Sequence, residues 1–237
     1  MDTRIDLLDM APPACAPPDG LQALVRSSLE QAVAGVGKLP ADVLAIPGMS
    51  GRKYRYFINN LIGSMRAPKY LEVGSWAGST LCSAILANDV TALAIDNWSS
   101  FDGPADKFLA HLSRFKGTAR VSFLEQDFRA VDYDSVGKSV GPFNVYLFDG
   151  PHKMDDQYDG IVIAQPALAD RYVQIVDDWN WPRVRNGTLK AIADLGLRIE
   201  FSAEIRTSLD DQHAPPPHGE RSDWHNGYYI AVLARPN

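Results

Sequence analysis

The amino-acid sequence predicts an α/β fold, a doubly wound sheet of seven mostly parallel strands with a helical preface before it. From residue 69 onward, short apolar segments of strand length alternate with stretches whose apolar residues recur at helical spacing. Such alternation places helices on both faces of a parallel sheet. The last two apolar segments are separated only by a polar loop that contains prolines. We therefore expect them to form an antiparallel strand pair at one edge.

The first 68 residues predict two helices after a leader. Residues 1–20 contain four prolines in two Pro-Pro pairs, which favours a flexible or extended leader. Apolar residues at helical spacing predict one amphipathic helix over residues 21–36. Ser50 is a candidate N-cap for a second helix that ends near Met65. The chain thus divides into a leader (1–20), an N-terminal helical cap (21–68) and a main α/β domain (69–237).

The main domain contains every predicted strand. These are Tyr70–Val73, Ala92–Ile95, Val121–Leu124, Val145–Phe148, Val173–Val176, Leu197–Arg206 and Gly227–Ala234. The predicted helices between them are Ser79–Ala87, Pro104–Phe115, Asp155–Ala169 and Pro182–Leu195. Because no linker or internal repeat interrupts this region, we expect one globular domain.

Composition and charge limit the kinds of partner. The 237 residues carry a net charge of −6 with scattered basic residues, which argues against a nucleic-acid partner because phosphate binding needs a basic face. The sequence has no signal-peptide pattern, and no apolar run approaches the roughly 18 residues of a membrane span. Cys15 and Cys82 form no Cys-x-x-Cys motif, which is typical of a reducing cytoplasm. We expect a cytoplasmic protein with no membrane partner and leave a homo-oligomer open.

A glycine-containing turn follows the first strand of the main domain. Gly74 and Gly78 allow a sharp turn and the close approach of a ligand or helix. A dinucleotide site requires G-x-G-x-x-G, but Trp76 occupies the place of the middle glycine, which disfavours a nicotinamide or flavin cofactor. Asp96 ends the second strand, where a carboxylate can accept hydrogen bonds from both hydroxyls of a ribose. Asp127 follows the third strand and could accept a hydrogen bond from an adenine amine.

A structural alternative exists for two acidic residues near this turn. Glu72 and Asp127 could instead cap the N-termini of neighbouring helices, where the helix dipole favours a carboxylate. Both interpretations stay open for Asp127. Trp98 likewise could stack near an adenine or pack in the core.

Acidic residues also follow the fourth and fifth predicted strands. Asp149 ends the fourth strand and Asp177-Asp178 ends the fifth, so the three carboxylates should meet at one rim of the sheet. Converging carboxylates repel one another unless a cation neutralises them, and oxygen ligands of this kind suit Mg²⁺. His152 is a candidate general base because imidazole titrates near neutrality. The alternatives are a solvated Asp-Asp turn and a His152 that caps the helix beginning near Asp155.

Three segments of the sequence resemble a known family. They are Met49–Thr80, with MSGRKYRYFINN and YLEVGSWAGST, then AIDNW and LFDGPHKMDDQ. These segments resemble class I S-adenosylmethionine (SAM)-dependent methyltransferases, and more narrowly the metal-dependent, macrocin-type sugar O-methyltransferases. The resemblance covers roughly residues 48–180 and implies a Rossmann-like methyltransferase fold with SAM and Mg²⁺ as cofactors.

The resemblance also implies which residues bind the cofactor. Glu72, Gly74 and Ser75 would line the methionine part of SAM, Asp96 would hold the ribose and Asp127 would lie near the adenine. Further residues expected at the cofactor are Trp76, Ser79, Thr80, Asn97, Trp98, Phe128 and Asp149.

The resemblance also implies which residues bind the metal and which residue acts as the base. The family's metal-binding positions match Asp149, Asp177 and Asp178. Some family members carry an aspartate base two residues after the metal aspartate, but Pro151 stands there in this chain. This departure favours His152 as the base, with Asp149 as the second catalytic residue.

The expected activity is methylation of a hydroxyl group on a small molecule, a sugar moiety first and a catechol-like phenol second. Two segments are candidates for the wall of a substrate pocket, residues 52–55 and the loop 207–226, which mixes aromatic residues, histidines and prolines. The three histidines of that loop lack the spacing of metal ligands. Two alternatives stay open: a metal-independent methyltransferase and a non-catalytic SAM-binding partner subunit.

Overall fold

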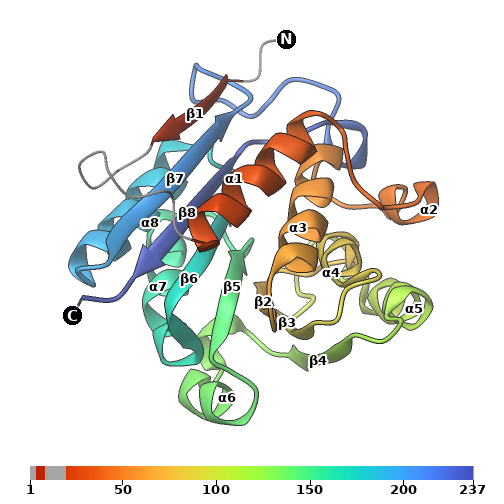
Figure 1. The fold of residues 1–237 in the computed structure, drawn as a ribbon, viewed down its shortest axis with the longest axis horizontal. Coiled ribbons are helices and arrows are strands. Elements are labelled where there is room, and N and C mark those ends of the chain that lie inside the picture. Colours follow the sequence, from red (N-terminus) through yellow and green to blue (C-terminus); the bar gives the residue numbers. More distant parts are fainter. Residues whose placement is uncertain (1–3, 9–19, 237) are drawn as a thin grey trace.

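The computed structural model describes residues 4–8 and 20–236, which form one mixed eight-stranded sheet with helices on both faces (Figure 1). The strands are β1 (Arg4–Leu8), β2 (Lys69–Val73), β3 (Thr91–Asp96), β4 (Arg120–Glu125), β5 (Phe143–Phe148), β6 (Leu168–Asp177), β7 (Arg198–Arg206) and β8 (Tyr228–Ala234). Their order across the sheet is β1-β7-β8-β6-β5-β2-β3-β4. The α/β fold and its helical preface are as predicted.

Helices account for most of the remaining chain. The α-helices are α1 (Gly20–Val33), α2 (Ala41–Leu44), α3 (Arg52–Ser64), α4 (Ser79–Ile85), α5 (Ala105–Phe115), α6 (Tyr133–Ser139), α7 (Met154–Ile163) and α8 (Pro182–Asp194). Three short 3₁₀ segments are η1 (Phe128–Ala130), η2 (Gln165–Ala167) and η3 (Gly219–Arg221). Within the described ranges, no helix is both long and apolar enough to cross a membrane.

The predicted count of seven strands is wrong by one. Residues 4–8, assigned from the sequence to the flexible leader, form β1 and pair antiparallel with β7, with Arg4 opposite Arg206. The strand covers an edge of β7 whose backbone groups would otherwise lack partners. The remainder of the predicted leader, residues 1–3 and 9–19, lies outside the described residues. The antiparallel pairing of β7 with β8 is confirmed, but β1 rather than β7 occupies the edge.

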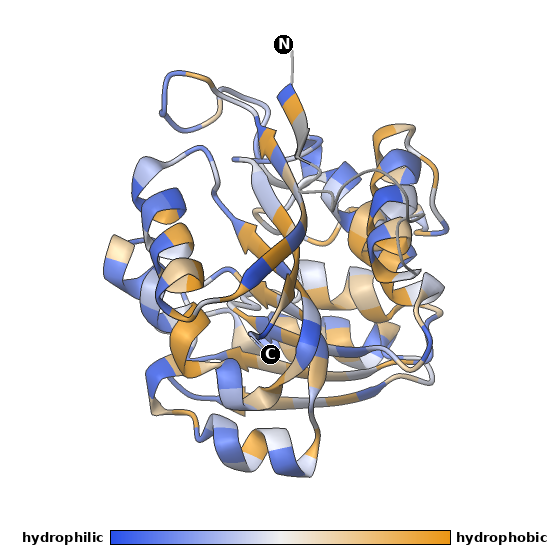
Figure 2. Cartoon of the chain, turned by 60° about the vertical axis from the view of Figure 1, so that its left-hand side comes forward, coloured by the Kyte–Doolittle hydropathy of each residue, from blue (hydrophilic) through white to orange (hydrophobic). Residues whose placement is uncertain are grey.

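Two apolar layers hold the sheet between its helices. Strand residues alternate between the layers, so Tyr70 contributes to one and Leu71 to the other. The first layer packs beneath α1, α3, α4 and α5, and the second beneath α6, α7 and α8. Figure 2 shows hydrophobic residues along the central strands and hydrophilic residues on the outer helical surfaces.

Two predicted helix boundaries differ from the structure for local reasons. The helix expected to run from Asp155 to Ala169 ends at Ile163, and β6 begins at Leu168, because Pro166 cannot continue an α-helix. Ser50 does not cap the second helix, whose N-cap residue is Gly51. The Ser50 hydroxyl instead accepts a hydrogen bond from Arg55 Nε at 3.0 Å.

The order of the parallel strands creates a switch point between β2 and β5. From β2 the chain proceeds outward to β3 and β4, and from β5 it proceeds in the opposite direction to β6. Ligands of doubly wound proteins bind at the carboxyl ends of the strands where the order reverses. The glycine turn after β2 and Asp149 after β5 flank this point.

Candidate active site

The turn after β2 brings its backbone directly against the end of β5. Gly74 has φ +89°, and its N–H donates to the Ile95 carbonyl at 2.9 Å. A Cβ at this position would lie 1.9 Å from the Asp149 carbonyl oxygen. Only glycine fits, both because of its left-handed backbone and because of this contact. Gly78, with φ +85°, ends the turn before α4.

Asp96 fastens the turn to the end of β3. One carboxylate oxygen accepts the Trp76 N–H at 2.8 Å, and the other accepts the Trp98 N–H at 2.7 Å. The Trp98 indole in turn donates to the Trp76 carbonyl at 2.8 Å. Because a carboxylate oxygen can accept more than one hydrogen bond, Asp96 retains capacity for ribose hydroxyls beside a fixed backbone.

The residues expected near adenine are occupied with local contacts. Asp127 accepts the Arg129 N–H at 2.9 Å and so caps η1, which is the capping role raised as an alternative. Its other carboxylate oxygen lies 3.5 Å from the exposed Asn97 amide nitrogen. Phe128 is buried edge-on against Phe148, with ring centroids 5.2 Å apart.

Trp98 also packs rather than standing free. Its ring lies 5.1 Å from Phe108 and 6.3 Å from Phe123, between centroids. The indole therefore covers the first apolar layer at the rim of the sheet, so the core-packing interpretation describes its contacts in the structure.

Glu72 is a buried carboxyl group beneath the glycine turn. Tyr70 donates its hydroxyl to one Glu72 oxygen at 2.5 Å, so its partner is a side chain and not a helix terminus. The other oxygen is buried with no partner among the described residues. Burial raises the pKa of Glu72 from 4.5 to about 7, while the hydrogen bond from Tyr70 opposes the rise.

Ser75 in the glycine turn is buried, as are Ser79 and Thr80 at the start of α4. The Ser75 hydroxyl has no hydrogen-bond partner among the described residues, whereas the Ser79 hydroxyl lies 3.2 Å from that of Ser50. The start of α4 is thereby linked to the loop that precedes α3.

The predicted acidic cluster forms around His152. The Nε2 atom of His152 lies 3.0 Å from Asp178 Oδ2 and 3.7 Å from Asp149 Oδ1. Asp177, at the end of β6, is buried beside them, and Asp178 adopts a left-handed backbone with φ +57°. Four residues from two adjacent strand ends thus meet where the sequence placed them.

The carboxylates in this cluster repel one another. The pKa of Asp149 is raised well above its usual range by burial and by repulsion from Asp178, and that of Asp177 by burial and by Asp149. One oxygen each of Asp177 and Asp178 is buried without a hydrogen-bond partner in the described part of the chain. Among those residues, however, no group of three or more His, Cys, Asp or Glu side chains is arranged to hold a metal ion.

Two tyrosines face the same region, one from the candidate pocket segment 52–55 and one that the sequence did not single out. Tyr54 of α3 and Tyr228 of β8 stack with centroids 4.0 Å apart and planes at 4°. Both hydroxyls are buried and lack a partner among the described residues. Burial and the nearby charge of Asp177 raise the pKa of each well above its usual range. Their spacing in the sequence gives no signal of this pairing.

The two segments expected to form a pocket wall lie against each other. The N–H groups of Arg52 and Lys53 donate to the carbonyls of Ser222 and Asp223, each at 2.9 Å. Lys53 also forms an ion pair with Asp223 at 2.9 Å. The N-terminus of α3 is therefore capped by the loop 207–226.

Arg55, one of the residues expected in the pocket wall, is instead buried in the protein interior. It is fully buried and donates to the carbonyls of Leu44 and Ile46, at 3.0 and 2.9 Å. Burial lowers the pKa of its guanidinium to about 10. Arg55 thus fixes the loop between α2 and α3 from inside.

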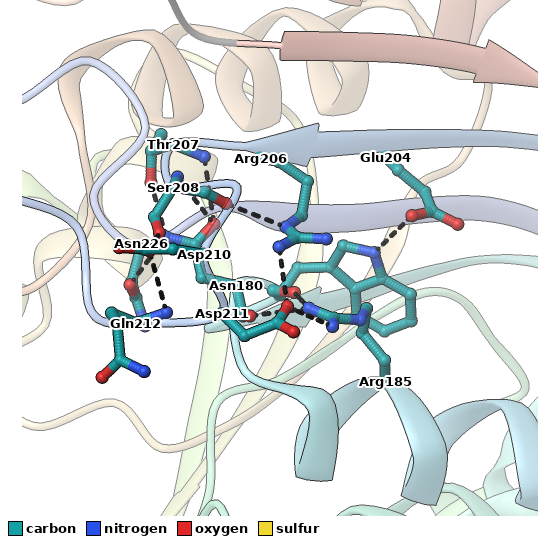
Figure 3. A network of polar contacts seen from close by, with 11 residues as sticks. Asn180, Arg185, Glu204, Arg206, Thr207, Ser208, Asp210, Asp211, Gln212 and Asn226 are labelled. Carbon is teal, nitrogen blue, oxygen red and sulfur yellow. Dashed lines mark hydrogen bonds and ion pairs between the residues drawn. The ribbon is translucent and has the colours of Figure 1, made fainter. Parts of the chain in front are cut away.

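A buried asparagine anchors the loop 207–226 to the end of β6 (Figure 3). The Asn180 side-chain oxygen accepts the N–H groups of Thr207 and Ser208, at 3.0 and 3.3 Å. Its amide nitrogen donates to Asn226 Oδ1 at 2.9 Å, and that oxygen also accepts the Ala214 N–H. Both ends and the middle of the loop are therefore held by one polar network.

Comparison with solved structures identifies the fold. TomG from Streptomyces achromogenes, an O-methyltransferase involved in tomaymycin synthesis and solved with SAM, is 12% identical over 93% of this chain and 92% of that chain, with a TM-score of 0.51. Cofactor-bound Rv0187 from MTB is 16% identical over 94% of each chain, with a TM-score of 0.50. No protein-family model and no curated protein matches the sequence. The chain has the α/β Rossmann-like fold of class I methyltransferases.

Proposed function

We propose that this protein is a SAM-dependent O-methyltransferase that acts on a hydroxyl group of a small molecule, a sugar moiety before a phenol. One observation carries the proposal: the glycine turn, fixed by Asp96, touches Asp149 across the β2–β5 switch point, and Asp149 borders His152. A nucleoside-binding turn and a candidate base thus lie side by side.

The cofactor would lie over the turn after β2. SAM supplies an electrophilic methyl group on a positively charged sulfur. Asp96 would accept the ribose hydroxyls, and the buried, unpartnered atoms of Glu72 and Ser75 would bind the polar end of the methionine part. Leaving such atoms unpaired costs about 1–3 kcal/mol each, so a polar ligand is favoured there.

His152 would remove the proton of the acceptor hydroxyl. As the hydroxyl oxygen bonds to the methyl carbon, the carbon–sulfur bond breaks with its electron pair on sulfur, and the proton passes to the imidazole. Asp178 and Asp149 face Nε2 of His152 and would stabilise the imidazolium that forms.

A divalent ion such as Mg²⁺ is the second cofactor we propose. Asp149, Asp177 and Asp178 would hold it, and once bound it would neutralise the acidic cluster and lower the pKa of an acceptor hydroxyl. The unpartnered oxygens of Asp177 and Asp178 and the raised pKa of Asp149 support this assignment. Because the side chains are not arranged as a set of ligands in the structure, they would have to reorient.

Calorimetric titration and a product assay test the proposal together. We expect the purified protein to bind S-adenosylhomocysteine, and a panel of glycosides and catechols to elicit its release from SAM. Binding without turnover on any acceptor would favour the non-catalytic alternative, and turnover unaffected by EDTA would favour a metal-independent enzyme. Absence of binding would overturn the proposal. We propose no nucleic-acid or membrane partner.

A further inference from the structure

An open pocket lies beside the glycine turn, between residues 47–49 and the loop 207–226. Its volume is about 400 Å³. Trp76 of the turn lines one side, residues 47–49 a second, and His213, His218 and His225 a third. Ligand pockets typically begin at about 300 Å³, so the space suits one ring-sized group.

The three loop histidines, which lack the sequence spacing of metal ligands, form a cluster. The centroid of the His213 ring lies 4.9 Å from that of His218 and 5.4 Å from that of His225. His225 is buried. His213 is exposed and His218 is half-buried. The network around Asn180 holds the loop on which the three histidines lie, so the cluster belongs to an anchored segment.

Hydrogen bonds to the backbone determine which nitrogen of each ring is a donor and which is an acceptor. Nδ1 of His225 accepts the Gly219 N–H at 3.1 Å, so its proton is on Nε2, which is a donor. Nδ1 of His213 lies 3.0 Å from the Ala214 carbonyl, which can only accept, so this nitrogen carries the proton. In the neutral ring, Nε2 of His213 is then an acceptor. Nδ1 of His218 is buried without a partner among the described residues.

A hydroxyl group matches this combination best, because it donates and accepts at once. A carboxylate or phosphate only accepts and would leave the His213 acceptor unpaired, while an ammonium group only donates and would leave the His225 donor unpaired. The charges of Glu220 and Arg221, both at the cavity, cancel and give no net preference for an ion. Trp76 and Met49 supply the apolar surface for a ring.

The cavity also lies close to the candidate base. His152 packs edge-on against Trp181 with centroids 5.5 Å apart, and Trp181 lies 5.7 Å from His213. Burial lowers the pKa of the His225 imidazole to about 4, although the nearby charge of Asp178 opposes the fall. The ring is therefore neutral. One side chain, Trp181, therefore lies between the loop histidines and His152.

We propose that this histidine pocket binds a neutral ring with adjacent hydroxyl groups, and that the loop histidines select it over charged analogues. The inference rests on the proposed function, since the ring is the methyl acceptor. A glycoside and a catechol share this chemistry, and the experiment distinguishes them.

Ligand-observed NMR on the protein saturated with S-adenosylhomocysteine provides the test. The probes are methyl glucopyranoside and catechol, each beside its carboxylated counterpart, glucuronate and protocatechuate. We expect one neutral probe to bind and its acid to bind about tenfold more weakly, the loss typical of one or two unsatisfied hydrogen bonds. Equal or preferred binding of both acids, or binding of none of the four probes, would overturn the proposal.

Two variants test whether the neutral probe binds in this pocket. Met49→Trp should fill it and abolish binding of the neutral probe, whereas Leu209→Trp, on an exposed residue of the same loop outside the cavity, should not. Binding that survives Met49→Trp overturns the assignment.

A spectroscopic readout separates this inference from the proposed function. Long-range ¹H–¹⁵N spectra should show His225 protonated at Nε2 and His213 at Nδ1, and the resonances of both should shift with the neutral probe. Probe binding without SAH release from SAM would contradict the methyltransferase proposal alone. SAH release together with the opposite tautomers would contradict the pocket assignment alone.

Discussion

Nε2 of His152 lies 3.0 Å from Oδ2 of Asp178, and this places an imidazole among carboxylates at the ends of two neighbouring strands. Nε2 has no hydrogen-bond partner among the described residues, so the contact is electrostatic: the carboxylate would stabilise a proton on the ring by its charge. We expect His152→Ala to lower kcat by about 10²–10⁴-fold, the range of a lost general base. Affinity for S-adenosylhomocysteine, measured by calorimetry, should stay within error, and a kcat close to that of the parent protein would remove His152 from the mechanism.

Asp96 should determine cofactor affinity. Asp96→Ala removes the carboxylate that accepts the Trp76 and Trp98 N–H groups and would hold the ribose, so we expect binding of S-adenosylhomocysteine to weaken about 10- to 100-fold. Asp106→Ala is a matched control, because Asp106 is an exposed acid at the start of α5. An equal loss in both variants would point to net charge instead of a specific contact.

Glu72 should make stability depend on pH. Its pKa is raised from 4.5 to about 7, so below pH 4.5 the carboxyl is protonated in both folded and unfolded chains. Between pH 4.5 and about 7, the Glu72 carboxyl ionises only in the unfolded chain. The free energy of unfolding therefore falls as pH rises, by about 3 kcal/mol in total. Glu72→Gln cannot ionise, so its free energy of unfolding relative to the parent should improve between pH 4.5 and 8. Denaturant titrations without SAM measure this difference; a constant offset across that range would show that Glu72 is not buried as a carboxylic acid.

Asp177 provides the test of metal assistance. We expect EDTA to abolish turnover of the parent protein and added Mg²⁺ to restore it. Asp177→Asn should lose turnover and show no response to Mg²⁺, while its affinity for S-adenosylhomocysteine is retained. Turnover in Asp177→Asn that equals that of the parent, with or without EDTA, would exclude Asp177 as a ligand.

Asn180 should control the order of the pocket loop. Asn180→Ala removes an amide that bonds Thr207, Ser208 and Asn226. We expect hydrogen exchange over residues 207–226 to accelerate and stability to fall by about 1–3 kcal/mol, because buried polar groups lose partners. Gln212→Ala, an exposed residue of the same loop, is the control. Similar exchange in the two variants would mean that Asn180 does not anchor the loop.

The sequence predicted those features that depend on neighbours along the chain. Apolar segments of strand length located the ends of β2, β3, β5 and β6, and because parallel strands end at one rim, Asp96, Asp149 and Asp177 could be placed there. The resemblance in the glycine turn indicated the Rossmann-like methyltransferase fold. Each of these inferences needs only local pattern and topology.

Features that depend on distant partners could not be predicted. Ser50 has the composition of an N-cap, but a buried Arg55 uses its hydroxyl. Asn180 carries no motif, and its importance follows only from the loop that folds back onto it. The loop histidines lack regular spacing, yet their rings gather because the loop curves around Asn226. Pairing of β1 with β7 likewise joins segments with almost the whole chain between them.

The contact between α3 and the loop 207–226 also has a consequence for the order of assembly. The side chain of Arg52 donates to the carbonyl of Glu220, 168 positions later in the chain. During synthesis the strands around the glycine turn emerge first, whereas the histidine pocket lacks six of its ten lining residues until the loop leaves the ribosome. Under the proposed function, a nascent chain completes the turn for the methyl donor well before it completes the pocket for the acceptor.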